Sequence, residues 1–352
     1  MTLLDSPNSY ALDASGMFEH IERLGTELEL AWAAHGQTPV VGLRPTSLTL
    51  AGMGGSASAA DYFAGMVERR ASIPLSVVRD YHLPGHVGPG SLVAVVSYSG
   101  TTDEAISCYE EALRRGASTF AVTSGGELAD LARKHGQPVC VIDYDAPPRA
   151  ALAHTLAPLL ALAPAAGAAG FAAAAIRDAA EAHRSRVRAE LGRTVPAVSN
   201  PAKQAAKDLA TGGIPVIFGA EHLAAVGRRA KNQFAENAKA LAVFEEMPEA
   251  SHNTVVSLEE AGPPQVGLAF DSPLLDVGNR RRIEITARLF AERSFPFHCY
   301  QLSGQSLLAD MFEATAFVDF ASCYLAMLRG IDPTPTPNLT RVRAEAAAAE
   351  AV

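Results

Sequence analysis

The sequence predicts an α/β fold of two doubly wound domains, each a parallel β-sheet flanked by helices. Short apolar runs, typical of buried strands, alternate with segments of helical periodicity. The order of these elements in the first half of the chain recurs in the second half. Strands that alternate with helices imply right-handed crossovers, and therefore parallel sheets.

The first half begins with a helical segment. Apolar residues from Phe18 to Trp32 recur at spacings of three and four, which predicts one buried helix face. A glycine-rich turn, Gly52–Ser58, follows the first strand and leads into a helix; tight packing of helix on sheet explains such a turn as well as ligand binding does. The predicted strands of this half are residues 47–51, 75–78, 92–96, 119–122 and 139–142.

The second half repeats this outline. Its predicted strands are residues 214–219, 241–244, 265–270 and 295–300, with helices over about 224–240 and 305–329. We therefore divide the chain into an N-terminal helical segment (1–45), a first domain (46–165), a helical linker (166–210) and a second domain with a long C-terminal helix (211–352).

Composition excludes several classes of protein. A hydrophobic fraction of 48% and a charged fraction of 19% are typical of a soluble globular protein. The net charge of −9 argues against non-specific nucleic-acid binding. The sequence starts without a signal-peptide pattern. The four cysteines, Cys108, Cys140, Cys299 and Cys323, have neither metal-ligand nor disulfide spacing, so we expect a cytoplasmic protein.

One segment has the length of a membrane span. Residues 150–176 are almost free of charge, and 27 residues of helix would cross a bilayer. However, the segment is mostly alanine, which carries little transfer energy, and Pro158 and Pro164 interrupt it. We expect a buried, broken helical segment and no association with a membrane.

A hydroxyl-rich loop is the strongest candidate for a binding site. Residues 97–104, Ser-Tyr-Ser-Gly-Thr-Thr-Asp-Glu, lie between a predicted strand and a predicted helix, where open α/β sheets bind ligands. Hydroxyl groups and free helical N–H groups suit a phosphate. The alternative is a helix cap by Thr102 or Ser99, which the carboxylates of Asp103 and Glu104 also suit. The corresponding loop of the second half, residues 271–273, carries an aspartate that would repel a phosphate.

The second half offers a carboxylate and an imidazole. Glu236 lies near the end of a predicted helix, and His252 lies in a loop after the next strand. Together in one cleft they would serve acid and base chemistry near neutral pH. Taken singly, each is as readily a solvated surface residue.

Six short motifs, in order, resemble the bifunctional phosphoglucose/phosphomannose isomerase family, which is built from two sugar isomerase (SIS) domains. The matching segments are residues 52–56, 97–102, 123–126, 148–151, 236–239 and 248–253. The resemblance implies interconversion of glucose 6-phosphate and mannose 6-phosphate with fructose 6-phosphate through a cis-enediolate, without a metal or other cofactor. It also implies a homodimer.

The resemblance further implies a role for each matching residue. Glu236 matches the base that moves the proton between C1 and C2, and Arg149 matches the arginine near the enediolate. His252 matches the histidine that opens the sugar ring and that reaches in from the partner subunit. Positions implied to hold the sugar phosphate are Ser56, Ser97, Ser99 and Thr102, with Gly54 and Gly55 beside the substrate.

The sequence departs from the family at one position. Tyr324 stands where some members have a lysine close to the ring oxygen, and a tyrosine is neutral at pH 7. Tyr324 is therefore a candidate substrate-binding residue with a changed chemistry. Two other readings of the chain are a non-catalytic SIS protein that binds a phosphosugar and regulates a partner, and an amidotransferase-type SIS module.

Overall fold

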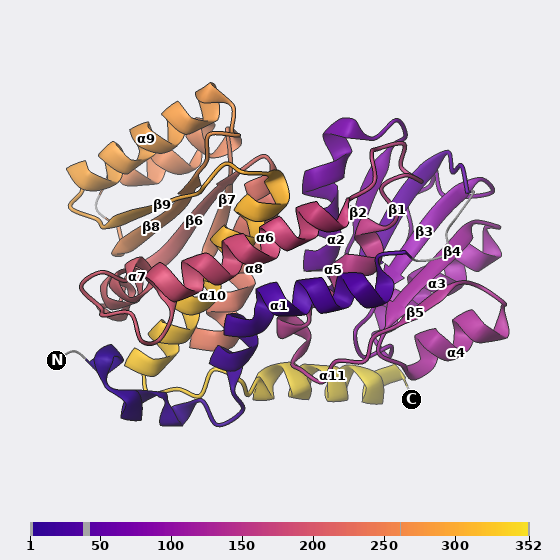
Figure 1. Cartoon of the computed structure of the whole chain (residues 1–352), viewed down its shortest axis with the longest axis horizontal. Helices are drawn as coiled ribbons and strands as arrows, with labels where there is room; N and C mark the ends of the chain where they lie inside the picture. The colour runs from indigo at the N-terminus through magenta and orange to yellow at the C-terminus, as the bar shows by residue number, and fades with distance from the viewer. Residues whose placement is uncertain (1–2, 38–42, 261, 351–352) are drawn as a thin grey trace.

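The computed structural model of the chain describes residues 3–37, 43–260 and 262–350, and it contains two parallel β-sheets flanked by helices (Figure 1). The first sheet has the order β2-β1-β3-β4-β5, and the second has the order β7-β6-β8-β9. All pairings that join these strands are parallel. The predicted fold class is confirmed.

The strands agree closely with the apolar runs of the sequence. The first sheet comprises β1 (Ser47–Gly52), β2 (Leu75–Val78), β3 (Ser91–Val96), β4 (Ser118–Thr123) and β5 (Val139–Val141). The second comprises β6 (Ile214–Ala220), β7 (Val243–Met247), β8 (Gln265–Asp271) and β9 (Phe297–Gln301). In each sheet the chain reverses its direction of strand addition between two central strands, β1 and β3 or β6 and β8. Such a switch point leaves a crevice at the carboxyl ends of the strands.

The helices form a layer between the sheets and a covering outside them (Figure 1). α3 and α4 pack on the outer face of the first sheet and α9 on the second, whereas α1, α6 and α10 lie between the two. The longer helices are α1 (Met17–His35), α2 (Gly54–Val67), α3 (Asp103–Arg114), α4 (Gly126–Lys134), α5 (Leu152–Leu160), α6 (Ala173–Arg186), α7 (Pro201–Ala210), α8 (His222–Ala238), α9 (Val277–Glu292), α10 (Leu307–Leu328) and α11 (Pro337–Glu350).

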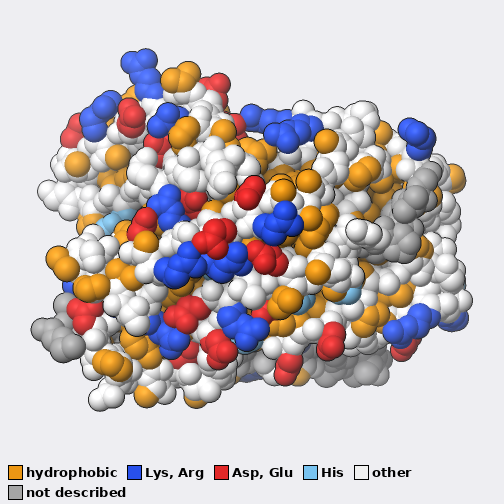
Figure 2. All heavy atoms as spheres, in the orientation of Figure 1, with side chains coloured by type: hydrophobic (Ala, Val, Ile, Leu, Met, Phe, Trp, Pro, Cys, Tyr) orange, Lys and Arg blue, Asp and Glu red, His pale blue; other side chains and the backbone are white. Residues whose placement is uncertain are grey.

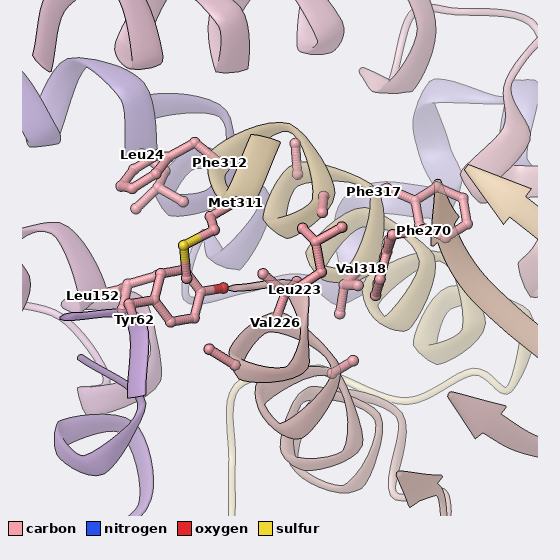
Figure 3. Close-up of a cluster of buried hydrophobic side chains, with 14 of the residues drawn as sticks. Leu24, Tyr62, Leu152, Leu223, Val226, Phe270, Met311, Phe312, Phe317 and Val318 are labelled. Atoms are coloured by element: carbon pink, nitrogen blue, oxygen red, sulfur yellow. The ribbon is translucent and has the colours of Figure 1, made fainter. Parts of the chain in front are cut away.

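Helix α10 is the centre of the core. It packs against α6, α7 and α8, and its side chains from Leu308 to Met327 are all buried. Figure 3 shows Met311 and Phe312 of this helix beside Leu24 and Tyr62 from the N-terminal half of the chain. On the other side Phe317 lies next to Phe270 of β8. One continuous apolar cluster thus joins the two sheets.

The same helix has the length and apolar composition of a membrane span, but 94% of the relevant stretch is buried inside the protein. Its burial is that of a core helix. Residues 150–176, in contrast, contain the nine-residue α5 and the start of α6 with turns between them. Pro164 lies in these turns, as predicted, whereas Pro158 lies within α5, and the part after residue 166 is largely exposed rather than buried. On the face shown in Figure 2, acidic and basic side chains alternate over α6, where Glu181 pairs with Arg184 and Arg188.

Several boundaries differ from the prediction. β7 spans Val243–Met247 rather than residues 241–244, β9 begins at Phe297 rather than at residue 295, and α8 ends at Ala238, two residues before the predicted end. Lys239 adopts a left-handed conformation (φ 52°), and the Ala240 N–H returns to the Phe234 carbonyl, so the chain turns here. Leu241 is 78% exposed in that turn, although its apolar side chain is typical of a strand.

Candidate active site

The hydroxyl-rich loop lies at the switch point of the first sheet. It follows β3, and the glycine-rich turn at residues 53–56 follows the neighbouring strand β1. The two loops touch, because the Tyr98 N–H donates to Ser56 Oγ (3.1 Å). Ser56 and Ser97 are buried at the base of this group, whereas Ser99 and Thr101 are exposed. The sequence predicted these hydroxyls as a phosphate site; the fold places them at the carboxyl ends of the neighbouring strands β1 and β3, and the phosphate site stays a prediction.

The alternative of a simple helix cap does not describe the loop. Thr102 is the N-cap residue of α3, yet no side chain accepts a hydrogen bond from the first turn. Thr102 Oγ1 instead accepts from Ser97 Oγ (3.0 Å), and Ser97 Oγ accepts from the Gly100 N–H (3.1 Å). The free N–H groups at the start of the twelve-residue helix α3 therefore lie next to the hydroxyls of Ser97 and Thr102. This arrangement suits an anion.

A second segment approaches this crevice from β5. The short helix η4 (Pro148–Ala150) passes so close to Gly55 that a Cβ on Gly55 would lie 2.8 Å from the Pro148 carbonyl oxygen. Only glycine allows this approach. Arg149 is consequently fixed beside the glycine-rich turn, and Gly54 (φ +52°) opens α2 next to it.

Arg149 joins the two halves of the site. Its guanidinium is buried (4% exposed) and donates through Nη1 to Glu236 Oε2 at 3.3 Å. Its Nε donates to Asn237 Oδ1 (2.7 Å), and its Nη2 donates to the carbonyls of Pro333 and Thr334. Burial lowers the pKa of Arg149 from its ordinary value, and the Glu236 carboxylate opposes that shift. Arginine nevertheless stays charged at neutral pH.

Glu236 is partly exposed, at 25% of its side chain, in the last turn of α8. It is the one acidic side chain to which Arg149 donates within the described residues, and it lies where solvent or a ligand can reach it. Lys239 lies close by: its Nζ donates to the carbonyls of Glu236 and Pro333. Burial lowers the pKa of Lys239, and the nearby Arg149 charge adds to that effect. A carboxylate, an arginine and a lysine thus meet next to η4, the segment that contacts the glycine-rich turn at Gly55.

His252 is in a different place. It is exposed at the end of the short helix η6 (Glu249–His252), which follows the carboxyl end of β7. Glu236, by contrast, lies at the end of α8, and α8 runs back toward the amino end of β7. The structure therefore brings Arg149 and Glu236 together within one chain and leaves His252 apart from them.

Tyr324 lies in the core. Its side chain is fully buried, its ring packs against Phe18 and Phe320, and its hydroxyl donates to the Leu191 carbonyl (2.7 Å). Burial is the main cause that raises its pKa far above the ordinary value. The structure does not bring Tyr324 together with Arg149 and Glu236. Its hydroxyl group is bonded to the Leu191 carbonyl inside the core instead.

At the second sheet's switch point an internal carboxylate occupies the corresponding crevice. Asp310 is fully buried and accepts hydrogen bonds from Ser272 Oγ and from the Gly304 N–H (2.9 Å), with His222 Nε2 at 3.4 Å. Asp310 thus already uses donors that a phosphate bound here would need. The sequence-based argument concerned Asp271, whose carboxylate pairs with Arg280, and the expectation that a phosphate binds in the first domain stays a prediction.

The sequence analysis missed several buried polar residues around Arg149. Arg229 and Asn237 of α8 and Asp319 of α10 all contact it or its neighbours. A charged residue within the apolar run of α10 was the available signal for Asp319. Within the described residues, no group of three or more His, Cys, Asp or Glu side chains is arranged to hold a metal ion.

Comparisons with known proteins agree with these features. Residues 198–345 match the family model described as "Bacterial phospho-glucose isomerase C-terminal SIS domain". The chain is 32% identical to a bifunctional phosphoglucose/phosphomannose isomerase of Caldicellulosiruptor bescii, over 92% of this chain and 96% of that one. It is 31% identical to the enzyme of the same name from Thermoplasma volcanium, over 85% and 91%.

A solved structure supports the fold alone. The chain superposes on a glucose-6-phosphate isomerase like protein from Thermus thermophilus with a TM-score of 0.62 and 22% identity, over 98% of this chain and 99% of that one. The identities to the curated relatives extend over nearly the whole chain. The chain therefore belongs to the bifunctional phosphoglucose/phosphomannose isomerase family and is an isomerase.

Proposed function

We propose that the protein interconverts glucose 6-phosphate and mannose 6-phosphate with fructose 6-phosphate by proton transfer between C1 and C2. The contact of Arg149 with Glu236, at 3.3 Å and next to the glycine-rich turn, is the observation that carries this proposal. Removing a proton next to a carbonyl requires a positioned base, and the resulting enediolate oxygens require a nearby cation. Glu236 is the base, and the buried charge of Arg149 stabilises the cis-enediolate.

The hydroxyl-rich loop, residues 97–104, is the phosphate loop of this proposal and holds the other end of the substrate. Ser99 and Thr102 supply hydroxyls to the phosphate above the buried Ser56 and Ser97, and the N–H groups at the start of α3 favour a dianion. An anchored phosphate fixes the distance from C6 to the reacting carbons, so the sugar chain extends from the loop toward Arg149 and Glu236. The proposed site thus spans the two halves of the chain.

The remaining role, opening of the sugar ring, requires a second subunit. α8 carries Glu236 fourteen residues from its start at His222, a distance of about 21 Å along a helix. The five residues of β7 extend roughly 16 Å before the loop with His252 begins. The two side chains therefore belong to opposite ends of β7. In a homodimer with two-fold symmetry, His252 of one subunit enters the site of the other.

A coupled assay tests the proposed activity. Fructose 6-phosphate is supplied, and glucose 6-phosphate is detected with a dehydrogenase that reduces NADP. We expect turnover by the parent protein and a loss of about 10²–10⁴-fold in Arg149→Ala, because the cation acts in the transition state. Tight binding of 6-phosphogluconate without turnover of either aldose would instead establish the non-catalytic phosphosugar-binding alternative.

A further inference from the structure

The position of Arg149 is determined by residues of the second half of the chain. Four of its hydrogen bonds go to Asn237, Glu236 and the carbonyls of Pro333 and Thr334. A fifth contact holds its backbone: the Arg149 carbonyl oxygen accepts from Arg229 Nη1 at 2.9 Å. Arg149 and Arg229 are 80 positions apart in the sequence, so this contact depends on the tertiary fold and not on local structure.

Arg229 is itself held by an aspartate. Its Nη2 donates to Asp319 Oδ2 (2.7 Å), and the other carboxylate oxygen of Asp319 accepts from Gln233 Nε2 (2.7 Å). Arg229, Gln233 and Asp319 are 3%, 2% and 2% exposed. Both carboxylate oxygens are used, so the aspartate of α10 fixes the direction of the arginine of α8.

From these contacts we propose that Arg229, held by Asp319, is a positioning residue that aligns Arg149 with Glu236 and with the phosphate loop. The proposal rests on the proposed function, because alignment has a kinetic meaning only if Arg149 stabilises a transition state. Arg229 does not touch the substrate. It acts through the η4 backbone, which Gly55 of the glycine-rich turn also contacts.

Stability alone explains this pair poorly. Taking two charges out of water is costly, and apolar residues of similar volume commonly serve a core as well or better. Arg229 also leaves its buried Nε without a hydrogen-bond partner among the described residues, which adds a desolvation cost. What the pair supplies, and an apolar pair would not, is a directed N–H group on the Arg149 carbonyl. A displacement of about 1 Å at a catalytic group is enough to lower a rate by about 10²-fold.

The test uses a variant that removes both charges together. Arg229→Met alone would strand the Asp319 carboxylate in the core, so Arg229→Met/Asp319→Asn is preferred, since asparagine keeps an acceptor for Gln233. Arg228→Met is the matched control. Arg228 is the adjacent arginine of α8, but it is 42% exposed and lies near the carboxylates of Asp61 and Glu246 rather than near Arg149. Circular dichroism and 6-phosphogluconate affinity establish that each variant is folded and binds phosphosugar.

We expect the double variant to lose about 10²-fold in kcat for fructose 6-phosphate, with KM nearly unchanged and the Arg228→Met control at the parent rate. The decisive comparison repeats the double substitution in an Arg149→Ala background. Because a positioning residue acts through Arg149, the further loss there should be less than about twofold. A full 10²-fold loss in that background, or a parental kcat in the double variant, overturns the proposal.

An NMR measurement separates this proposal from the proposed function. The Nε–H resonance of Arg149, assigned by its disappearance in Arg149→Ala, reports the hydrogen bond to Asn237 without any substrate. We expect it to shift or to exchange rapidly with water in Arg229→Met/Asp319→Asn and to be unchanged in Arg228→Met. An inactive parent protein would contradict the proposed function, whereas an unchanged Arg149 resonance in the double variant would contradict the positioning role.

Discussion

At the scale of single residues, Arg149 connects the glycine-rich turn, the proposed base and the segment that follows α10. Its backbone lies against Gly55, and its guanidinium reaches Glu236 and the carbonyls of Pro333 and Thr334. Charges in a buried environment interact more strongly than they do in water. The buried charge of Arg149 is therefore suited to stabilise an oxyanion that forms beside it.

A buried histidine makes the stability of the protein depend on pH. His183 of α6 is fully buried, and neither ring nitrogen has a hydrogen-bond partner among the described residues. Burial lowers the pKa of His183 from 6.5 to about 3, with a smaller contribution from Arg184. The folded protein therefore keeps this imidazole neutral at a pH where the unfolded chain already binds a proton.

We predict an acid sensitivity from this residue. The pKa of His183 is lower in the folded protein than in the unfolded chain. Above about pH 6.5 both states carry a neutral imidazole, so the free energy of unfolding is not reduced. As the pH falls toward about 3, only the unfolded chain binds the proton, and the free energy of unfolding decreases. Between pH 7 and pH 5 the loss from His183 is about 2 kcal/mol. Urea unfolding at both pH values measures it, and His183→Leu should lose correspondingly less stability. An identical pH dependence in parent and variant would refute the assignment.

At the scale of elements, the loops after β1, β3 and β4 form one packed unit. Gly100 has a positive φ (+69°), and a Cβ there would lie 1.8 Å from the Gly125 carbonyl oxygen. Gly126 approaches the Ser99 carbonyl in the same way. The hydroxyl-rich loop therefore derives its shape from the loop beside it as well as from its own sequence.

A pair of glycine substitutions tests this packing. Gly100 and Gly136 both have positive φ, but a Cβ on Gly136 would have no atom within 4 Å. Gly136→Ala should therefore cost only the backbone strain of about 1–2 kcal/mol and leave phosphosugar affinity unchanged. Gly100→Ala should displace the loop and weaken 6-phosphogluconate binding, measured by calorimetry. Equal affinity in the two variants would mean that the loop shape is not needed for binding.

Local elements were predictable from the sequence, and long-range contacts were not. The strand β3 and the loop after it are a local apolar run and a local hydroxyl cluster, and the structure has both. The start of β7 was misplaced because Leu241 is apolar yet lies in an exposed turn. The pairing of Arg229 with Asp319 spans 90 positions, so no local pattern reveals it.

At the scale of the whole molecule, the core helix α10 lies between the two sheets and packs against α8, which carries Glu236. Residues from the first sheet's loops, from η4 and from α8 converge within one chain, whereas His252 follows the far end of β7. A complete site in our proposal therefore contains residues of two subunits.

Mixing two inactive variants tests the shared site. We expect Glu236→Gln and His252→Ala to recover activity after subunit exchange, because half of the sites in mixed dimers carry both intact residues. The matched control mixes Glu236→Gln with Arg149→Ala. These two residues contact each other within one chain, so exchange cannot restore them to one site. No recovery in the first mixture, with exchange confirmed by native mass spectrometry, would contradict a shared site.

The most direct test of the central claim follows fructose 6-phosphate in D₂O by NMR. We expect glucose 6-phosphate and mannose 6-phosphate to form with deuterium at C2. Glu236→Gln should still bind 6-phosphogluconate but react about 10²–10⁴-fold more slowly, since only the base is removed. Glu246→Gln, which removes an exposed carboxylate elsewhere, should react at the parent rate. Absence of both aldoses, or a parental rate in Glu236→Gln, would contradict an isomerase that uses Glu236 as its base.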